Sequence, residues 1–216
     1  MRGTVMKPVV IFDLDGTLVD SGSVVFQGFQ YAVEPWGITL TLADIESVRT
    51  AKPYGLFAPF VGEQHAIEAY ERLASYSKAH AHMVPMFPGI QDLLTQLSLS
   101  GAAMGLWTGR DYSSTCDILN GNCIHQMFGA VVAGCHVENN KPAQDGLHLL
   151  AELFGVTTKA MIVVGDHDHD LVPATESGAH TIGVNWGNNA NQFLEVVPNK
   201  ICTTIRDLGL HLQNLL

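Results

Sequence analysis

Short apolar segments alternate with stretches of helical spacing along most of this chain. The apolar segments are rich in Val and Ile, as buried strands are, and occupy residues 8–12, 102–107, 129–133, 161–164 and 180–184. The stretches with helical spacing occupy residues 89–99, 113–122, 144–155 and 170–177. This alternation predicts an α/β fold, a Rossmann-like parallel sheet with helices on both faces.

The long interval between the first two strands differs from the rest of the chain. Residues 21–83 contain no convincing strand, and their apolar positions follow helical spacing. The first predicted helix has its apolar positions at Val24, Val25, Phe26, Phe29 and Val33. A short second helix is indicated by Ile45 and Val48. A long third helix is predicted over 63–82, with one side formed by Ile67, Tyr70, Leu73, Ala74 and Ser77. We therefore expect an α/β core of residues 1–20 and 84–216, with a helical domain, residues 21–83, inserted into it. A last apolar stripe predicts a final helix in 204–216.

Two carboxylates follow the first strand directly. Asp13 and Asp15 are two residues apart, so an extended backbone places both on one side, and Gly16 then allows a turn. The carboxyl ends of strands are where open α/β sheets bind ligands. Buried carboxylates need compensating charge, and a divalent metal would supply it. The alternative is an Asp-Gly turn with exposed acids.

A second acidic site follows the strand at 161–164. Gly165 precedes Asp166, and Asp170 comes four residues later. His167 and His169 flank Asp168 in this segment, which raises the alternative of a transition-metal site. We interpret both histidines as loop residues.

Composition restricts the partners. The chain of 216 residues has only 11 Lys and Arg and a formal net charge of −10. Nucleic-acid binding is therefore not expected, since phosphate backbones require basic surfaces. No apolar run approaches the roughly 20 residues of a membrane span, and residues 1–7 have no apolar signal core, so we expect a cytoplasmic protein that does not bind membranes. Four scattered cysteines indicate reduced, partly buried thiols, with a zinc site as the alternative.

Four segments together resemble the motifs of the haloacid dehalogenase superfamily. The first motif is Asp13-x-Asp15-Gly16-Thr17, and the second is similar to Thr108-Gly109, which follows the apolar run that ends at Trp107. Lys141, the only basic residue between Arg110 and Lys159, resembles the lysine of the third motif. Gly165-Asp166-x-x-x-Asp170 resembles the fourth motif. The inserted helical domain resembles the cap that such enzymes place after their first motif.

This resemblance implies a role for each matching residue. Asp13 would be the nucleophile and Asp15 the general acid and base. Mg²⁺ would bind the Asp13 carboxylate, the Asp15 main-chain carbonyl and the Asp166 carboxylate. Thr17 and Asp170 would orient these ligands without binding the ion directly.

Thr108, Gly109 and Lys141 would bind the phosphate oxygens in similar enzymes. The cap turn that contains Arg49 and Lys52 would recognise the rest of the substrate, the alternative being a solvated turn. Arg110 either touches the substrate or is a surface arginine at a helix start.

The resemblance implies a Mg²⁺-dependent phosphatase of the phosphoglycolate-phosphatase-like group. It would hydrolyse small phosphorylated metabolites through an aspartyl phosphate, as a monomer or dimer. The alternatives are a phosphomutase of the β-phosphoglucomutase type and a non-catalytic binding protein on the same fold. Those mutases carry a His on the first cap helix, and residues 22–35 contain none. Dehalogenation and phosphonate hydrolysis are disfavoured by Asp15, although Lys52 is a feature shared with phosphonate hydrolases.

Overall fold

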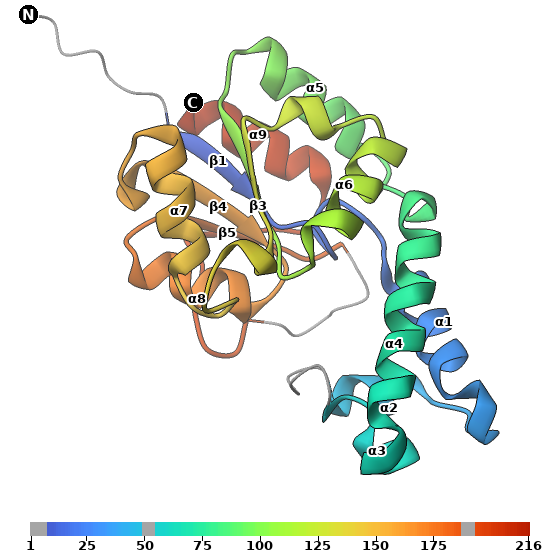
Figure 1. The fold of residues 1–216 in the computed structure, drawn as a ribbon. Helices are drawn as coiled ribbons and strands as arrows, with labels where there is room; N and C mark the ends of the chain where they lie inside the picture. Colours follow the sequence, from blue (N-terminus) through green and yellow to red (C-terminus); the bar gives the residue numbers. More distant parts are fainter. Residues whose placement is uncertain (1–7, 49–54, 187–192) are drawn as a thin grey trace, which may run out of the picture. The chain divides into compact units, whose positions relative to one another are not determined.

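The structure, a computed structural model, describes residues 8–48, 55–186 and 193–216. Contacts within the chain divide it into two compact units, one of Met1–Asp20 with Pro85–Leu216 and one of Ser21–Val84. The second boundary lies one residue beyond the position expected from sequence. We refer to them as the α/β unit and the helical unit (Figure 1).

The described residues of the α/β unit form one sheet of six parallel strands. The strands are β1 (Val9–Phe12), β2 (Met104–Trp107), β3 (Ala130–Val132), β4 (Met161–Gly165), β5 (His180–Val184) and β6 (Lys200–Cys202). They lie in the order β3-β2-β1-β4-β5-β6, and every neighbouring pair is parallel. The predicted α/β fold is confirmed. Only β6 was not expected, because an edge strand of three residues that begins with Lys gives no apolar run.

The strand order positions the site. The chain moves from β1 outward to β2 and β3, then returns to place β4 on the other side of β1. Ligands of open α/β sheets bind where the order reverses, at the carboxyl ends of the strands. Here that place lies between β1 and β4, whose last residues precede Asp13 and Asp166.

Helices cover both faces of this sheet, as expected. They are α5 (Ile90–Leu99), α6 (Tyr112–Gly121), α7 (Asp145–Phe154), α8 (Asp168–Glu176) and α9 (Ile205–Leu215). On one face α7 and α8 pack on a core that includes Ile11, Trp107 and Val163, and on the other α5 packs beside α9 (Figure 1). Helix α8 begins two residues before the predicted start, so Asp170 lies in its first turn.

The helical unit consists of α1 (Gly22–Val33), α2 (Leu42–Ser47), α3 (Ala58–Val61) and α4 (Glu63–His80), with no strand among its described residues. Helix α1 packs on α4 around a core that includes Phe29, Val33 and Phe57. No helix in the described ranges is both long and apolar enough to cross a bilayer.

The buried side of α4 differs from the predicted one. Ala66 and Ala69 are buried, whereas Ile67 is 56% exposed and Ala74 is exposed. Tyr70 and Leu73 of the predicted face do pack against the core of this unit, so the prediction was wrong only in part. Helix α1 approaches α4 closely at Leu73, because Gly28 has no side chain and a Cβ there would lie 2.9 Å from Cδ1 of Leu73.

Candidate active site

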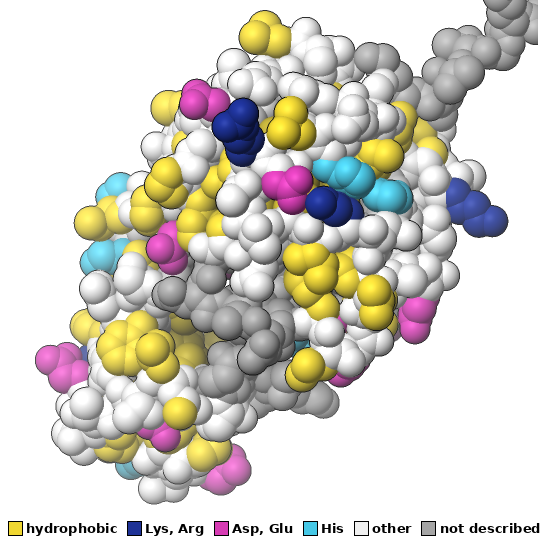
Figure 2. Space-filling view, turned by 180° about the vertical axis from the view of Figure 1, so that it is seen from behind, with side chains coloured by type: hydrophobic (Ala, Val, Ile, Leu, Met, Phe, Trp, Pro, Cys, Tyr) yellow, Lys and Arg dark blue, Asp and Glu magenta, His cyan; other side chains and the backbone are white. Residues whose placement is uncertain are grey.

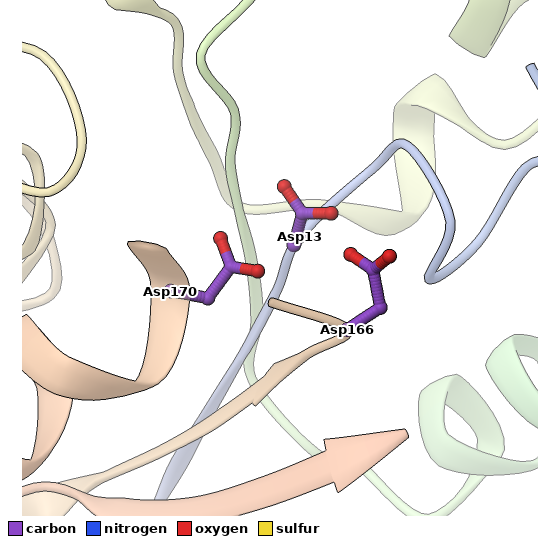
Figure 3. A group of neighbouring side chains, drawn as sticks. All are labelled: Asp13, Asp166 and Asp170. Carbon is purple, nitrogen blue, oxygen red and sulfur yellow. The ribbon is translucent and has the colours of Figure 1, made fainter. Parts of the chain in front are cut away.

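Three aspartates from three elements meet at the switch point of the sheet. Asp13 follows β1, Asp166 follows β4, and Asp170 comes from the first turn of α8. All three are buried, and each offers a carboxylate oxygen within 4.8 Å of the others. Figure 3 shows the three carboxyl groups pointing toward one another. Buried like charges at this separation repel, so the arrangement requires positive charge.

The turn after β1 brings the first motif into this cluster. The Asp13 N–H donates to the carbonyl of Val164, 2.9 Å away, which continues the pairing of β1 with β4. Gly16 has a φ of +81°, and a Cβ at this position would lie 2.2 Å from Oδ2 of Asp166. Glycine is required here for both its backbone conformation and its size.

Lys141 supplies positive charge from the loop after β3. Its Nζ donates to Oδ1 of Asp13 at 2.7 Å and to Oδ1 of Asp170 at 2.6 Å. A third hydrogen bond, of 2.8 Å, reaches the carbonyl of Trp107. Burial opposes the charged form of Lys141, but Asp13 and Asp170 outweigh it and hold the pKa of the ammonium above its ordinary value. Lys141 is therefore a charged lysine with all three donors in use.

The negative charge of the cluster exceeds what Lys141 offsets. Burial, then the neighbouring Asp170, raises the pKa of Asp13 well above its ordinary value, Asp166 adds to the rise, and Lys141 opposes it. Asp170 is held by a second donor, the N–H of His167, 3.2 Å from its Oδ2. The cluster thus has the charge and the oxygen atoms that a divalent cation requires.

The residues of the second motif lie at the carboxyl end of β2. Thr108 is buried, its N–H donates to the carbonyl of Val132, and its Oγ1 accepts from the N–H of Arg110 at 3.2 Å. Asn140 was not expected from sequence, yet its Nδ2 donates to the carbonyl of Gly109 at 2.9 Å. Its Oδ1 also accepts from the N–H of Lys141, so Asn140 joins the second and third motifs. Its position beside Lys141 was the only signal available.

Arg110 forms an ion pair with Asp15. Nε and an Nη of Arg110 donate to the two carboxylate oxygens of Asp15 at 2.6 and 2.7 Å. Burial disfavours the charged guanidinium, but the pKa of Arg110 is raised by Asp15 and, less strongly, by Asp111 and Asp13. Of the two expectations for Arg110, the exposed surface residue is wrong, because its side chain is only 18% exposed.

The remaining expected residues have varied positions. Thr17 is buried, its carbonyl accepts from Nε1 of Trp186, and its Oγ1 has no hydrogen-bond partner among the described residues. His167 caps the start of α8, and His169 lies inside that helix, so the interpretation of His169 as a loop residue is wrong; their ring centroids are 4.4 Å apart. Arg49 and Lys52 lie outside the described residues.

Asp168 has a structural contact that the sequence did not suggest. It is buried, and its Oδ2 accepts from the N–H groups of Leu194 and Glu195 at 2.9 and 3.1 Å. Asp168 therefore fastens α8 to the segment that precedes β6, while Asp166 and Asp170 face the cluster.

Comparisons with known proteins agree with this geometry. Residues 10–184 match the family model of the haloacid dehalogenase-like hydrolases. Tyrosine-protein kinase PtkA of Mycobacterium tuberculosis is 30% identical over 201 residues, which are 90% of this chain and 68% of that protein. Phosphoglycolate phosphatase of Escherichia coli is 27% identical over 228 residues, 92% of this chain and 90% of that protein.

A solved structure extends the likeness to three dimensions. A haloacid dehalogenase-like hydrolase of Streptococcus pneumoniae superposes with a TM-score of 0.83 at 26% identity, over 96% of this chain and 99% of that one. The match to the family model includes both acidic motifs, from Asp13 to Asp170. The chain therefore belongs to the haloacid dehalogenase-like hydrolases.

Proposed function

We propose that this protein is a Mg²⁺-dependent phosphatase that hydrolyses small phosphorylated metabolites through an aspartyl phosphate on Asp13. The observation that carries the proposal is the position of Lys141, whose Nζ donates to both Asp13 and Asp170. An ammonium at that point lies where the charge of a transferring phosphoryl group would have to be stabilised. Relatives named as phosphatases support the same assignment.

The donor set fits Mg²⁺. Mg²⁺ prefers hard oxygen ligands, and the cluster offers buried carboxylates with excess negative charge. We assign the ligands to the carboxylates of Asp13 and Asp166 and the main-chain carbonyl of Asp15. Asp170 already accepts from Lys141 and from the N–H of His167, so we assign it to orientation. The ion would offset the repulsion between the carboxylates and a phosphate dianion.

The protein groups can perform both halves of the reaction. In the first, an oxygen of Asp13 forms a bond to phosphorus, the bond to the leaving oxygen breaks, and Asp15 gives that oxygen a proton. In the second, Asp15 takes a proton from water while the water oxygen attacks phosphorus. Inorganic phosphate leaves, and the carboxylate of Asp13 is regenerated.

The phosphate oxygens would be bound by three groups at the ends of β2 and β3. We assign the Thr108 hydroxyl, the Gly109 N–H and the Lys141 ammonium to them. Asn140 fixes this arrangement through its bonds to the carbonyl of Gly109 and the N–H of Lys141. We assign the role of the cap to the helical unit, with Arg49 and Lys52 as the candidate residues for substrate recognition.

The surface supports a small substrate rather than a polyanion. Lys and Arg side chains are few and scattered on the face seen in Figure 2, in keeping with the 11 such residues of the whole chain. Binding to a phosphate backbone would need a continuous basic stripe.

Phosphoryl transfer to an acceptor other than water is the second candidate. The relative named as a tyrosine-protein kinase and a structural neighbour named as a β-phosphoglucomutase favour it. Both outcomes would pass through the same aspartyl phosphate. Incubation with p-nitrophenyl phosphate as donor and a sugar phosphate or a tyrosine-containing protein as acceptor, followed by analysis for phosphate on the acceptor, distinguishes transfer from hydrolysis.

The proposed function is tested by hydrolysis of p-nitrophenyl phosphate. We expect turnover with Mg²⁺ and its loss in excess EDTA, while Asp13→Asn should be inactive in both. Calorimetric titration with Mg²⁺ provides a second measurement, and Asp166→Asn should weaken the binding. Full activity in EDTA would contradict the metal assignment, and an active Asp13→Asn variant would contradict the nucleophile.

A further inference from the structure

Arg110 and Asp15 form an ion pair with two hydrogen bonds inside the candidate site. The planar guanidinium donates from two nitrogens to two oxygens, at 2.6 and 2.7 Å, which is the fork geometry that Arg uses to bind carboxylates and phosphates. The Arg110 side chain is 18% exposed and the Asp15 side chain 31% exposed. A pair of this kind exchanges partners more readily than a fully buried one, since water and solutes can reach it.

The backbone that carries Arg110 is held in place. The N–H of Gly134 donates to the carbonyl of Arg110 at 2.8 Å, and the N–H of Arg110 donates to Oγ1 of Thr108. The adjacent carbonyl of Gly109 accepts from Asn140. A change of partner by Arg110 is therefore a movement of its side chain alone. Since the guanidinium donates to Asp15, the residue assigned to proton transfer, it lies on the side of the site where the leaving group would be.

The proposed chemistry requires this pair to open. Asp15 must present an oxygen to the leaving group, yet both of its oxygens now accept from Arg110. Once Asp15 turns to the leaving group, the partly buried guanidinium loses its hydrogen-bond acceptors. Leaving these donors without acceptors raises the free energy of the complex. An oxyanion on the substrate itself would take the vacated place.

Lys141 cannot perform this recognition. It is assigned to the transferring phosphate, which every phosphate ester has in common, so it does not distinguish one leaving group from another. Among the described residues of the site, Arg110 is the cation whose present partner must leave during the reaction.

We propose that Arg110 determines specificity by binding a second anionic group, a carboxylate or a phosphate, on the leaving-group side of the substrate. This inference rests on the proposed function and deepens it. The substrate oxyanion replaces the Asp15 carboxylate on the guanidinium, and the same exchange releases Asp15 to the leaving oxygen. Binding of the substrate's second anion and release of the Asp15 carboxyl group from Arg110 then occur in the same step.

The kinetic test uses three esters that differ only beyond the reacting phosphate. They are 2-hydroxyethyl phosphate, whose leaving group is neutral, phosphoglycolate, which carries a carboxylate, and ethylene glycol bisphosphate, which carries a second phosphate. We would measure kcat/KM for each with the wild type, Arg110→Ala and Arg110→Lys. Arg206→Ala is the matched control, because Arg206 is exposed on α9 and its removal changes the net charge equally.

The readout is the ratio of kcat/KM for each anionic ester to that for the neutral ester. We expect Arg110→Ala to lower this ratio by roughly tenfold to 100-fold, the loss of charge-assisted hydrogen bonds, and Arg110→Lys to lower it less. Arg206→Ala should keep the wild-type ratio. The ester whose ratio falls identifies the anion as carboxylate or phosphate. An equal loss on all three esters would overturn the proposal, because Arg110 would then only position Asp15.

A binding experiment separates this inference from the proposed function. Phosphonoacetate and methylphosphonate are titrated calorimetrically into wild type and Arg110→Ala with Mg²⁺ present, and no turnover is required. We expect the wild type to prefer phosphonoacetate and Arg110→Ala to lose that preference. Equal affinities in the wild type would overturn the role of Arg110 even if the protein is a phosphatase. A protein that hydrolyses none of the esters would overturn the proposed function, and the binding comparison would still decide the role of Arg110.

Discussion

The ammonium of Lys141 lies over the indole ring of Trp107, with Nζ 4.5 Å from the ring centroid, and donates to the carbonyl of the same residue. Trp107 is the last residue of β2 and is almost fully buried. A cation over an aromatic face is stabilised, most strongly over Trp. The position of Lys141 therefore depends on the packing that holds Trp107, and in particular on Gly146 in the first turn of α7.

Gly146→Ala should disturb the site without changing any polar group. A Cβ at this position would lie 2.1 Å from Nε1 of Trp107, so the indole and Lys141 must shift. We expect a loss of about 1–3 kcal/mol in the free energy of unfolding, measured by urea denaturation, and a lower kcat. Gly209→Ala in α9 is the control, since its Cβ would lie 3.3 Å from one flexible Leu93 atom and alanine favours helices. Equal stability losses in the two variants would contradict this role of Gly146.

Lys141→Ala should slow the hydrolysis of every phosphate ester alike. The lost donor acts on the transferring group itself, and removal of one such donor costs about 10²–10³-fold in kcat. Removal also leaves Asp13 and Asp170 without their shared partner, which is expected to cost about 3–5 kcal/mol of stability for a buried pair. Steady-state kinetics with aryl and alkyl esters and urea denaturation measure the two effects. The exposed Lys159→Ala variant should match the wild type in both.

Asp13→Asn and Asp15→Asn should lose activity at different steps of the reaction. Asn at position 13 is a poor nucleophile, so radiolabelled phosphate should not become attached to the protein. Asn at position 15 cannot donate a proton, and kcat should fall by at least about 10²-fold with an alkyl phosphate, whose leaving group needs that proton, and less with an aryl phosphate. A near-normal kcat of Asp15→Asn with the alkyl ester would show that the role of Asp15 is misassigned.

The stability of the metal-free protein should depend on pH through Asp13. Burial, followed by Asp170, raises the pKa of Asp13 well above 3.8, so the folded state keeps a proton that the unfolded chain releases. The unfolding free energy should therefore fall as the pH rises from about 4 through the raised pKa. Urea denaturation at several pH values in EDTA measures this fall, and Mg²⁺ should reduce it by compensating the carboxylates. Asp13→Asn should flatten the profile in EDTA, and an unchanged slope would assign the effect to other groups.

The four cysteines should differ in their reaction with iodoacetamide at pH 8. All are free; Cys123 and Cys135 are exposed, which corrects the expectation of partly buried thiols throughout. Cys202 is buried, and burial, together with the charge of Asp207, raises its pKa to about 12, so almost no reactive thiolate exists at pH 8. Mass spectrometry should find rapid alkylation at 123 and 135 and almost none at 202. Rapid alkylation of Cys202 in folded protein would contradict its burial.

The local pattern of apolar and polar residues was enough to predict most of the fold and the acidic residues of the candidate site. The strands that precede Asp13 and Asp166 are runs of four and five buried residues, and such runs are visible without a structure. The helical insertion is equally visible from apolar spacing. These features depend on neighbours in sequence, because strand and helix periodicity arise from the backbone itself.

Contacts between distant segments were decided only by the tertiary structure. Arg110 and Asp15 are 95 residues apart, and nothing in the sequence of either segment shows that they form an ion pair. The buried side of α4 includes Ala66 and Ala69 together with Leu73 of the predicted face, and it depends on how α1 packs against this helix. Asn140 joins two motifs, and Asp168 fastens α8, through bonds to distant backbone groups. The sequence determines which groups can ionise, bend or pack, whereas the pairing of a given charge depends on which chain segments the packed sheet brings within about 3 Å.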